Sequence, residues 1–241
     1  MPIETSDAPQ IAAAPAQAHW KDLAAIIDHT LLKADAAAAD VERICNEAME
    51  YGVGCVMLNP ANLSLAGLLL SGTNTKLGSV VGFPLGATTT GAKRYEALEA
   101  IRLGAREIDM VMNIGALKAG DRTRVEVDMR GLVEVVHANG AILKVIIEAG
   151  LLSLEEKILA CQLAVAAGAD FLKSSTGFSG SGATAPDISL MRGVAGDKIG
   201  VKASGGIRTL HDAQMMIDAG ANRIGTSSTR AIVDEARGRI S

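Results

Sequence analysis

The chain is poor in the residue types on which nucleic-acid-binding and membrane proteins depend. Aromatic residues make up only 2% of its 241 residues, and a net charge of −4 with a pI near 5.6 leaves no basic stripe. Base stacking and phosphate-backbone binding are therefore disfavoured. No apolar run approaches the roughly 18 residues that a membrane span needs. The sequence predicts neither a nucleic-acid partner nor a membrane partner.

Patterns of metal ligands and disulfides are equally scarce. Cys45, Cys55 and Cys161 are odd in number and spaced for neither a zinc site nor a disulfide framework. Of the four histidines, only His29 falls at the end of an expected strand, so a metal centre is not expected. We predict no metal, no cofactor and a reducing, cytoplasmic setting, with Cys55 as a packed core thiol.

Hydrophobic residues, by contrast, are abundant. They form 49% of the chain, with a mean hydropathy of +0.26, as expected of a globular protein with a large core. Residues 1–19 carry Glu4 and Asp7 but neither a basic region nor a compact apolar stretch, which does not fit a secretory signal. We predict a single domain at residues 20–241, preceded by a disordered or loosely docked extension at residues 1–19.

Short apolar segments alternate with alanine-rich stretches of helical length. Glycine closes several helices just before the next strand, as in Leu103–Ala105 and Ala167–Ala169. A helix from Asp35 to Tyr51 is expected to begin at an Asp35 cap and to stop at Gly52. Near-continuous apolar strands in units of roughly 25 to 35 residues predict a (β/α)8 TIM barrel rather than an open sheet. The first expected strand ends at residue 30, and the others span residues 55–58, 76–83, 107–113, 142–148, 171–174, 200–203 and 223–225.

Two lysines stand where buried strands normally carry apolar residues. Lys173 lies in Phe171–Gly177 (FLKSSTG) and Lys202 in Gly200–Gly206 (GVKASGG), each shortly before a glycine-containing turn. Either lysine alone could reach solvent from its strand end. Two ammonium groups on neighbouring strands, however, add nothing to stability, whereas a site that needs one neutral amine benefits from their repulsion.

Carboxylates are expected near these lysines, because the carboxyl ends of all barrel strands meet at one face. Asp109 lies inside an apolar strand, where an unpaired carboxylate is costly. It is either a buried ion pair that fixes register or, as we favour, part of a catalytic carboxylate–lysine cluster. Asp28 either caps the segment after its strand or supports the site, and both alternatives stay open. Lys144 and Glu148 also fall near a strand end.

Glycine followed by a helix occurs after both the seventh and the eighth expected strand. Gly205 and Gly206 precede a helix capped by Thr209, with Asp212 three residues on, and Gly225–Ser228 repeats the arrangement. Free N–H groups at a helix start attract anions, and barrels often build phosphate sites from these two loops. Each loop alone is weak support, since tight turns need glycine anyway. Together they predict a phosphate site.

Six motifs stand out along the chain, namely DHTLL (28–32), VVGFPLGA (80–87), EIDMVMNIG (107–115), LKVIIEAG (143–150), FLKSSTGF (171–178) and VKASGGIRT (201–209). Taken together, they resemble the 2-deoxyribose-5-phosphate aldolase family. The resemblance extends from about Trp20 to Arg230, and the two lysine motifs are highly specific to that family.

The resemblance implies a class I aldolase that reversibly cleaves 2-deoxy-D-ribose 5-phosphate to acetaldehyde and D-glyceraldehyde 3-phosphate. It implies Lys173 as the Schiff-base lysine and Lys202 with Asp109 as the proton-transfer pair. Phosphosugar and aldehyde substrates and a homo-oligomer, a dimer or tetramer, are expected. The implied substrate- and phosphate-binding residues are Asp28, Thr30, Thr176, Gly177, Gly205, Gly206, Arg208, Gly225, Ser227 and Ser228.

One departure from the family concerns proton transfer. Some members end in a C-terminal tyrosine that assists catalysis, whereas this chain ends in Gly238–Ser241 (GRIS). Its only tyrosines are Tyr51 and Tyr95. Proton transfer is therefore expected to rest on Asp109, Lys202 and water.

A nucleophilic lysine also needs a lowered pKa, because a free lysine with a pKa of about 10.4 is almost fully protonated at pH 7. Bringing the pKa to about 7 takes roughly 4.6 kcal/mol of bias against the charged form. We expect the Lys202 ammonium to contribute about 3–4 kcal/mol of this, with burial supplying the rest and Asp109 opposing both.

Two rival functions remain open from the sequence. A phosphosugar isomerase or decarboxylase barrel would use a carboxylate base and has no need of paired strand lysines. A non-catalytic phosphosugar-binding barrel would be satisfied by the glycine loops alone. The cluster of Asp109, Lys173 and Lys202 would then bury charge without benefit.

Overall fold

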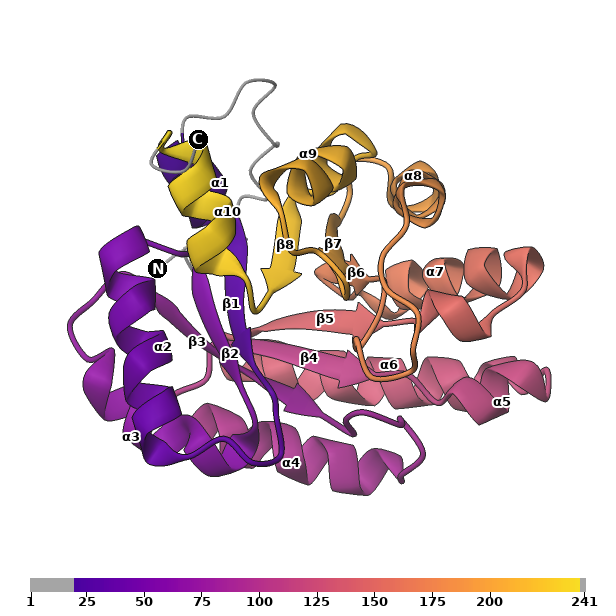
Figure 1. Cartoon of the computed structure of the whole chain (residues 1–241). Coiled ribbons are helices and arrows are strands. Elements are labelled where there is room, and N and C mark those ends of the chain that lie inside the picture. The colour runs from indigo at the N-terminus through magenta and orange to yellow at the C-terminus, as the bar shows by residue number, and fades with distance from the viewer. Residues whose placement is uncertain (1–19, 239–241) are drawn as a thin grey trace, which may run out of the picture.

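Each strand of the chain pairs in parallel with the strand before it, and the last pairs with the first (Figure 1). The computed structural model describes residues 20–238, so the extension expected at residues 1–19 lies outside the described residues. Within residues 20–238 the eight strands close into a barrel, and the predicted (β/α)8 architecture is confirmed.

The strands are short, and several end before the sequence pattern suggested. The third, fourth and fifth strands stop two residues earlier than expected, because polar or glycine-containing turns follow there and strand pairing ends. The strands are β1 (Ile27–Leu31), β2 (Cys55–Leu58), β3 (Lys76–Val81), β4 (Glu107–Val111), β5 (Ile142–Ile146), β6 (Phe171–Lys173), β7 (Gly200–Ser204) and β8 (Arg223–Thr226).

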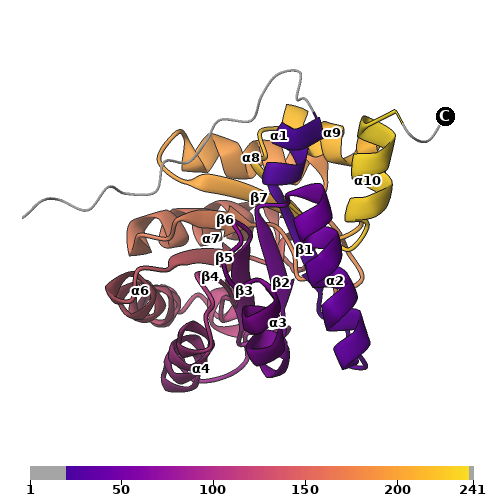
Figure 2. The same cartoon turned by 90° about the vertical axis from the view of Figure 1, so that its left-hand side faces the viewer.

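Helices follow the strands and wrap the outside of the barrel, and Figure 2 shows α2, α3, α4 and α6 around the strands. The first helix, α1, packs against the last helix, α10. The helices are α1 (Trp20–Ala25), α2 (Ala38–Tyr51), α3 (Leu63–Leu69), α4 (Thr90–Arg102), α5 (Ile114–Lys118), α6 (Arg122–Ala138), α7 (Leu154–Ala167), α8 (Ala185–Ala195), α9 (Leu210–Asp218) and α10 (Thr229–Ala236), with 3-10 turns η1 (Pro60–Asn62) and η2 (Ala149–Leu151).

Helix ends follow the expected chemistry at most positions. Gly52 ends α2 and Gly168 ends α7 in the left-handed conformation, with φ of 70° and 89°. The Asp35 cap is wrong, however, because α2 begins after Ala37 and its start is held by the Asp40 carboxylate, which accepts from the Ala37 N–H. The Asp40 carboxylate lies in the first helical turn, where it also complements the helix dipole.

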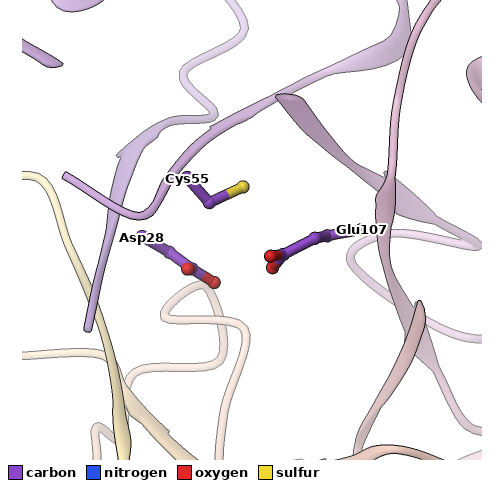
Figure 3. A group of neighbouring side chains, drawn as sticks. All are labelled: Asp28, Cys55 and Glu107. Carbon is purple, nitrogen blue, oxygen red and sulfur yellow. The ribbon is translucent and has the colours of Figure 1, made fainter. Parts of the chain in front are cut away.

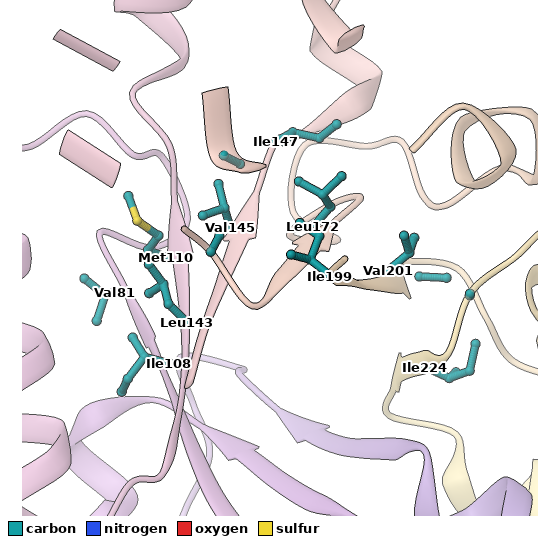
Figure 4. Close-up of a cluster of buried hydrophobic side chains, with 14 of the residues drawn as sticks. Val81, Ile108, Met110, Leu143, Val145, Ile147, Leu172, Ile199, Val201 and Ile224 are labelled. Carbon is teal, nitrogen blue, oxygen red and sulfur yellow. The ribbon is translucent and has the colours of Figure 1, made fainter. Parts of the chain in front are cut away.

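Alternation along the strands divides the buried side chains into two cores. One lies between sheet and helices and includes the outward-facing Ile108, Leu143 and Leu172 (Figure 4). The other lies inside the barrel and is small, with Leu32, Cys55, Met57 and Val80 in contact and Phe83 packed on them. These inner apolar residues come from the β1–β3 side, so the rest of the barrel interior is left for polar groups.

Candidate active site

The register of the barrel brings the predicted charged residues together. Lys173 pairs with Lys202 across β6 and β7, and Asp109 pairs with Lys144 across β4 and β5. Since paired residues of parallel strands face the same side of a sheet, all four side chains enter the barrel interior. The expected convergence of Asp109, Lys173 and Lys202 is confirmed as geometry.

Asp109 is the centre of this cluster and contacts three lysines. Its Oδ2 accepts from Lys173 Nζ and from Lys202 Nζ, each at 2.7 Å, and its Oδ1 accepts from Lys144 Nζ at 3.0 Å. All four residues are at most 3% exposed. One carboxylate thus serves three ammonium groups, and each lysine receives only a share of its charge.

A second layer of charge lies below, toward the amino-terminal ends of the strands. Lys144 Nζ contacts Glu107 at 2.5 Å and Asp28 at 3.4 Å. Arg223, on β8, donates to Asp28 at 2.8 Å and lies 3.3 Å from Glu107. Asp28 also accepts from Lys202, so it joins the two layers. We call Asp28, Glu107, Lys144 and Arg223 the barrel floor.

This placement decides between the two alternatives for Asp28. Its carboxylate is fully buried and engaged with cations inside the barrel, and α2 starts at Ala37 without it. The helix-cap alternative is wrong. Asp28 instead helps to hold Lys202 in place.

The electrostatic setting of Lys173 differs from the one expected. Burial lowers the pKa of Lys173 to about 8, Asp109 opposes that shift, and the neighbouring Lys202 ammonium adds to it as a smaller cause. We expected Lys202 to supply most of the bias, which is wrong, because removal from water is the larger cause. For Asp109, burial favours the neutral acid, but the three surrounding lysines outweigh it and hold its pKa well below the usual range.

Asp28, Cys55 and Glu107 point toward one another from β1, β2 and β4, with possible ligand atoms within 4.8 Å (Figure 3). Such a group could suit a cation. Lys144 and Arg223 already contact both carboxylates, however, so the protein's own cations occupy that role. Burial also raises the pKa of the Cys55 thiol well above its usual value, which disfavours the thiolate that a metal needs. Cys55 is a packed interior thiol, as predicted.

A cavity of about 270 Å³ opens above the cluster at the carboxyl ends of the strands. Lys173 lies at its base, and loops after β1, β6, β7 and β8 form its walls. It collects most of the predicted binding residues, namely Thr30, Thr176, Gly177, Gly205, Gly206, Arg208, Gly225 and Ser227. Ser228 does not line it, and its N–H donates to Thr226 Oγ1 at 2.9 Å.

The donors that an anion could use are not those of the α9 start. The predicted capping box is present, with Thr209 Oγ1 accepting from the Asp212 N–H at 3.1 Å and the Thr209 N–H donating to Asp212 at 3.0 Å. Asp212 thus occupies the helix N-terminus that we expected to be free. Within residues 20–238, the N–H groups of Gly206 and Ser227 make no hydrogen bond, so they are among the donors available to an anion in the cavity.

Several cavity residues were not singled out from the sequence. Lys33 lines the cavity from the loop after β1, and Phe178 lines it from the loop after β6, with its ring 5.2 Å edge-on from that of Phe83. In the sequence, Lys33 could have been noticed only as a positively charged residue that follows a strand. Phe178 could have been noticed only as an aromatic residue in a chain that has few of them. Tyr51 and Tyr95 do not line the cavity.

The closed barrel, with a buried amine–carboxylate cluster below a cavity at the carboxyl ends of its strands, is typical of the (β/α)8 class of enzymes. The DeoC/LacD family aldolase model matches residues 23–235. The chain belongs to that family, and it is an enzyme of the lyase class.

Relatives named as deoxyribose-phosphate aldolases match most of the chain. A deoxyribose-phosphate aldolase from Alkaliphilus oremlandii is 56% identical over 217 residues, 90% of this chain and 97% of that protein. The one from Geobacillus sp. is 54% identical over 88% of this chain and 95% of its own length. The structure of deoxyribose phosphate aldolase from Aeropyrum pernix, described as a tetramer, has a TM-score of 0.86 at 34% identity and covers 92% of this chain and 93% of that one.

Proposed function

We propose that the protein reversibly cleaves 2-deoxy-D-ribose 5-phosphate to acetaldehyde and D-glyceraldehyde 3-phosphate through a Schiff base on Lys173. One observation carries this proposal. Lys173 is a buried lysine with a pKa lowered to about 8, and it lies at the base of the cavity. A neutral amine in such a position is a nucleophile toward a carbonyl carbon.

In the synthetic direction, the Lys173 amine attacks the carbonyl carbon of acetaldehyde. The resulting carbinolamine takes up a proton and loses water to give an iminium ion, whose positive nitrogen draws electrons from the adjacent methyl carbon. Asp109 and Lys202, acting through a water molecule, remove a methyl proton and leave a neutral enamine. The low pKa of Asp109 means that it holds a proton only transiently, which suits a relay rather than storage.

The enamine carbon then attacks the aldehyde carbon of glyceraldehyde 3-phosphate, and a carbon–carbon bond forms. The new alkoxide takes up a proton, and water hydrolyses the iminium to release the sugar and free Lys173. The phosphate is held at the loops after β7 and β8, where Gly206 and Ser227 offer N–H groups and Arg208 offers a cation. Thr30, which lines the cavity from β1 beside β8, faces a sugar hydroxyl.

Borohydride trapping tests the proposal directly. With acetaldehyde present, reduction is expected to leave an ethyl group on Lys173, identified by peptide mapping. An adduct on Lys202 or Lys144, or no adduct, would overturn the assignment. The same assay in EDTA is expected to give the same yield, and a loss that zinc restores would point to a metal-dependent reaction instead.

The phosphate end has its own test in two neighbouring serines. Ser227→Asp places a carboxylate at the cavity wall, and we expect kcat/KM for the phosphorylated sugar to fall about 10- to 100-fold more than for deoxyribose. Ser228→Asp serves as the matched control, because Ser228 does not line the cavity. It is expected to produce a far smaller difference in kcat/KM between the phosphorylated sugar and deoxyribose. Equal losses for both sugars in Ser227→Asp would place the phosphate elsewhere.

Release of acetaldehyde from deoxyribose 5-phosphate separates this function from its rivals. An isomerase or decarboxylase barrel and a non-catalytic binding barrel would release none. The paired lysines around Asp109 favour the aldolase, because neither rival has a use for a neutral buried amine.

The setting of the enzyme completes the proposal. We infer a homo-oligomer, a dimer or tetramer, supported by the tetramer of the Aeropyrum pernix relative, and light scattering of the purified chain would measure its mass. No described helix is long and apolar enough to cross a membrane. Three buried free cysteines support a reducing, cytoplasmic setting. Residues 1–19 stay a predicted extension.

A further inference from the structure

Glu148, just after β5, has a backbone conformation that its residue type disfavours. Its φ of 54° and ψ of 59° place it in the left-handed region, and it is the one non-glycine residue with positive φ among residues 20–238. A side chain in this region strains the backbone, and such strain persists only where the surroundings enforce it. Glycine would fit with less strain, so the side chain of Glu148 is the feature to explain.

The carboxylate of Glu148 is also unusual in its surroundings. It is 1% exposed, and within the described chain no lysine, arginine or histidine forms an ion pair with it. Buried carboxylates normally pair with cations, as those of Asp28 and Asp109 do here. Glu148 instead accepts hydrogen bonds only from neutral groups of one segment, the loop after β6.

Those bonds reach two consecutive residues of that loop. Ser175 Oγ donates to Glu148 Oε1 at 2.7 Å, while the Thr176 hydroxyl and N–H donate to Oε2 at 2.5 and 3.1 Å. Each hydroxyl then supports the next turn of backbone. Ser175 Oγ accepts from the Gly177 N–H at 3.0 Å, and Thr176 Oγ1 accepts from the Phe178 N–H at 3.1 Å.

The backbone around Glu148 fixes the same loop from a second direction. The Ile147 N–H donates to the carbonyl of Lys173 at 3.0 Å, and the Ala149 N–H donates to that of Ser174 at 2.9 Å. With Glu148 in the left-handed conformation, the N–H groups of its two neighbours bond the consecutive carbonyls of Lys173 and Ser174. Its carboxylate meanwhile bonds the next two residues, Ser175 and Thr176. Four consecutive residues, namely Lys173 at the end of β6 and the three that follow it, are therefore held from one position.

The segment held in this way forms one wall of the cavity. Thr176, Gly177 and Phe178 all line it together with Lys173, and the Phe178 ring packs edge-on against that of Phe83. Ser175 itself is buried and does not line the cavity. Glu148 lacks any contact with the cavity as well, so it can influence substrate only through this wall.

We propose that Glu148 is a positioning residue that sets the cavity wall formed by residues 176–178 and thereby the binding of the phosphorylated sugar, without acting on the amine chemistry of Lys173. The proposal rests on the proposed aldolase function. Its chemistry is simple: one buried carboxylate orients two hydroxyl groups, and each hydroxyl fixes one N–H of the wall.

Two substitutions distinguish the effect of the backbone conformation of Glu148 from the effect of its carboxylate. Glu148→Gly tolerates the left-handed conformation but removes every side-chain bond, and we expect KM for deoxyribose 5-phosphate to rise about tenfold or more while kcat changes less than about threefold. Glu148→Gln keeps an acceptor for Thr176 and lets Ser175 donate to the Ser181 carbonyl, 3.0 Å away, so it is expected to restore most of the affinity. The yield and pH profile of acetaldehyde trapping on Lys173 are expected to stay as in the wild type.

Neighbouring buried serines give a matched pair in case Glu148→Gly does not fold. Ser175→Ala removes one of the two hydroxyl supports and is expected to raise KM severalfold. Ser174→Ala removes a hydroxyl that bonds instead to the backbone of Ser204 on β7, at 3.2 Å to its carbonyl and 3.1 Å from its N–H, and is expected to leave the wall at residues 176–178 in place.

Hydrogen–deuterium exchange of the unliganded protein supplies a readout that does not depend on activity. Amides of residues 175–178 are expected to exchange faster in Glu148→Gly and Ser175→Ala than in the wild type or Ser174→Ala. Unchanged KM and unchanged exchange in both variants would overturn the proposal, as would an equal loss of acetaldehyde trapping and sugar binding. A wild type that traps no acetaldehyde would instead reject the aldolase function, while the exchange data would still decide the positioning role.

Discussion

Lys144 in the barrel floor and Lys173 in the mouth are both removed from water, yet their pKa values move in opposite directions. Burial acts against the charged form of each. At Lys144, the nearby Asp109, Asp28 and Glu107 outweigh burial and hold its pKa well above the usual value. At Lys173, the single shared carboxylate of Asp109 does not outweigh burial, and the pKa falls to about 8.

The difference lies in how carboxylates are distributed between the two levels of the barrel. Lys144 Nζ has three carboxylates within 3.4 Å, whereas among residues 20–238 Lys173 Nζ has Asp109 alone, which it shares with Lys144 and Lys202. Burial therefore acts against the charge of both lysines, and the number of carboxylates around each ammonium decides whether its pKa rises or falls. Four substitutions or measurements can break or sharpen this comparison.

The largest effect is expected from Lys173→Met. Removing the proposed nucleophile should lower kcat/KM by about 10⁴-fold or more. Stability should not fall at pH 7. Because the folded-state pKa of about 8 lies below the unfolded value, the Lys173 ammonium disfavours the folded state below about pH 8, and this penalty fades as pH rises toward 10.4. A variant that is inactive because it unfolds, judged by urea denaturation, would contradict this.

Lys144→Met is expected to show the opposite behaviour. It leaves Asp109 and Glu107 buried with fewer cations, so the free energy of unfolding should drop by about 3–5 kcal/mol. Lys118→Met is the control, because its half-exposed pair with Glu156 should contribute less than about 1 kcal/mol. Equal effects on stability for both variants would mean that the floor is not held by its charges.

Lys202→Met removes one of the positive charges beside Lys173 and releases Asp109 to it. Both changes favour the Lys173 ammonium, so the midpoint of acetaldehyde trapping should shift above pH 8. Turnover at pH 7 should fall about 10²- to 10³-fold, since the proton relay is also lost. Recovery of trapping but not of turnover at high pH would mark Lys202 chiefly as the relay. A trapping profile identical to that of the wild type would show that it does not tune Lys173.

The smallest effect is the pH dependence of the wild type itself. With a pKa of about 8, Lys173 is mostly protonated at pH 7 and mostly neutral at pH 9. The initial rate of imine trapping should therefore rise roughly tenfold between these values and then level off. A rate that keeps rising to pH 10.5 would mean that burial does not lower the pKa, and the contrast with Lys144 would disappear.

The sequence predicts the fold and the pairing of catalytic candidates for a common reason, which is repetition. Lys173 and Lys202 occupy the same place in successive strand motifs, and parallel strands in register bring equal places side by side. Helix stops such as Gly52 are predictable because their local geometry needs glycine. These inferences depend only on neighbours along the chain.

The barrel floor and the balance of charges could not be predicted in the same way. Glu107 and Arg223 begin their strands, where charged residues are ordinary, and only barrel closure between β1 and β8 brings Arg223 to Asp28. The dominance of burial over Lys202 repulsion depends on distances and on exclusion of water. The role of Glu148 depends on a left-handed backbone angle, for which a glutamate in the sequence gives no signal.

The sparse counter-charge around Lys173 has a consequence for the proposed intermediate as well as for the free amine. An iminium nitrogen carries a positive charge, and this charge is neutralised when the adjacent carbon loses a proton and its electrons move toward the nitrogen. A site that holds a cation poorly makes that cation a stronger electron acceptor, so the bound aldehyde becomes a stronger carbon acid. Forming the neutral enamine removes the positive charge. The free-energy cost of a buried cation, which lowers the pKa of the free amine, therefore also favours the step that forms the carbon nucleophile.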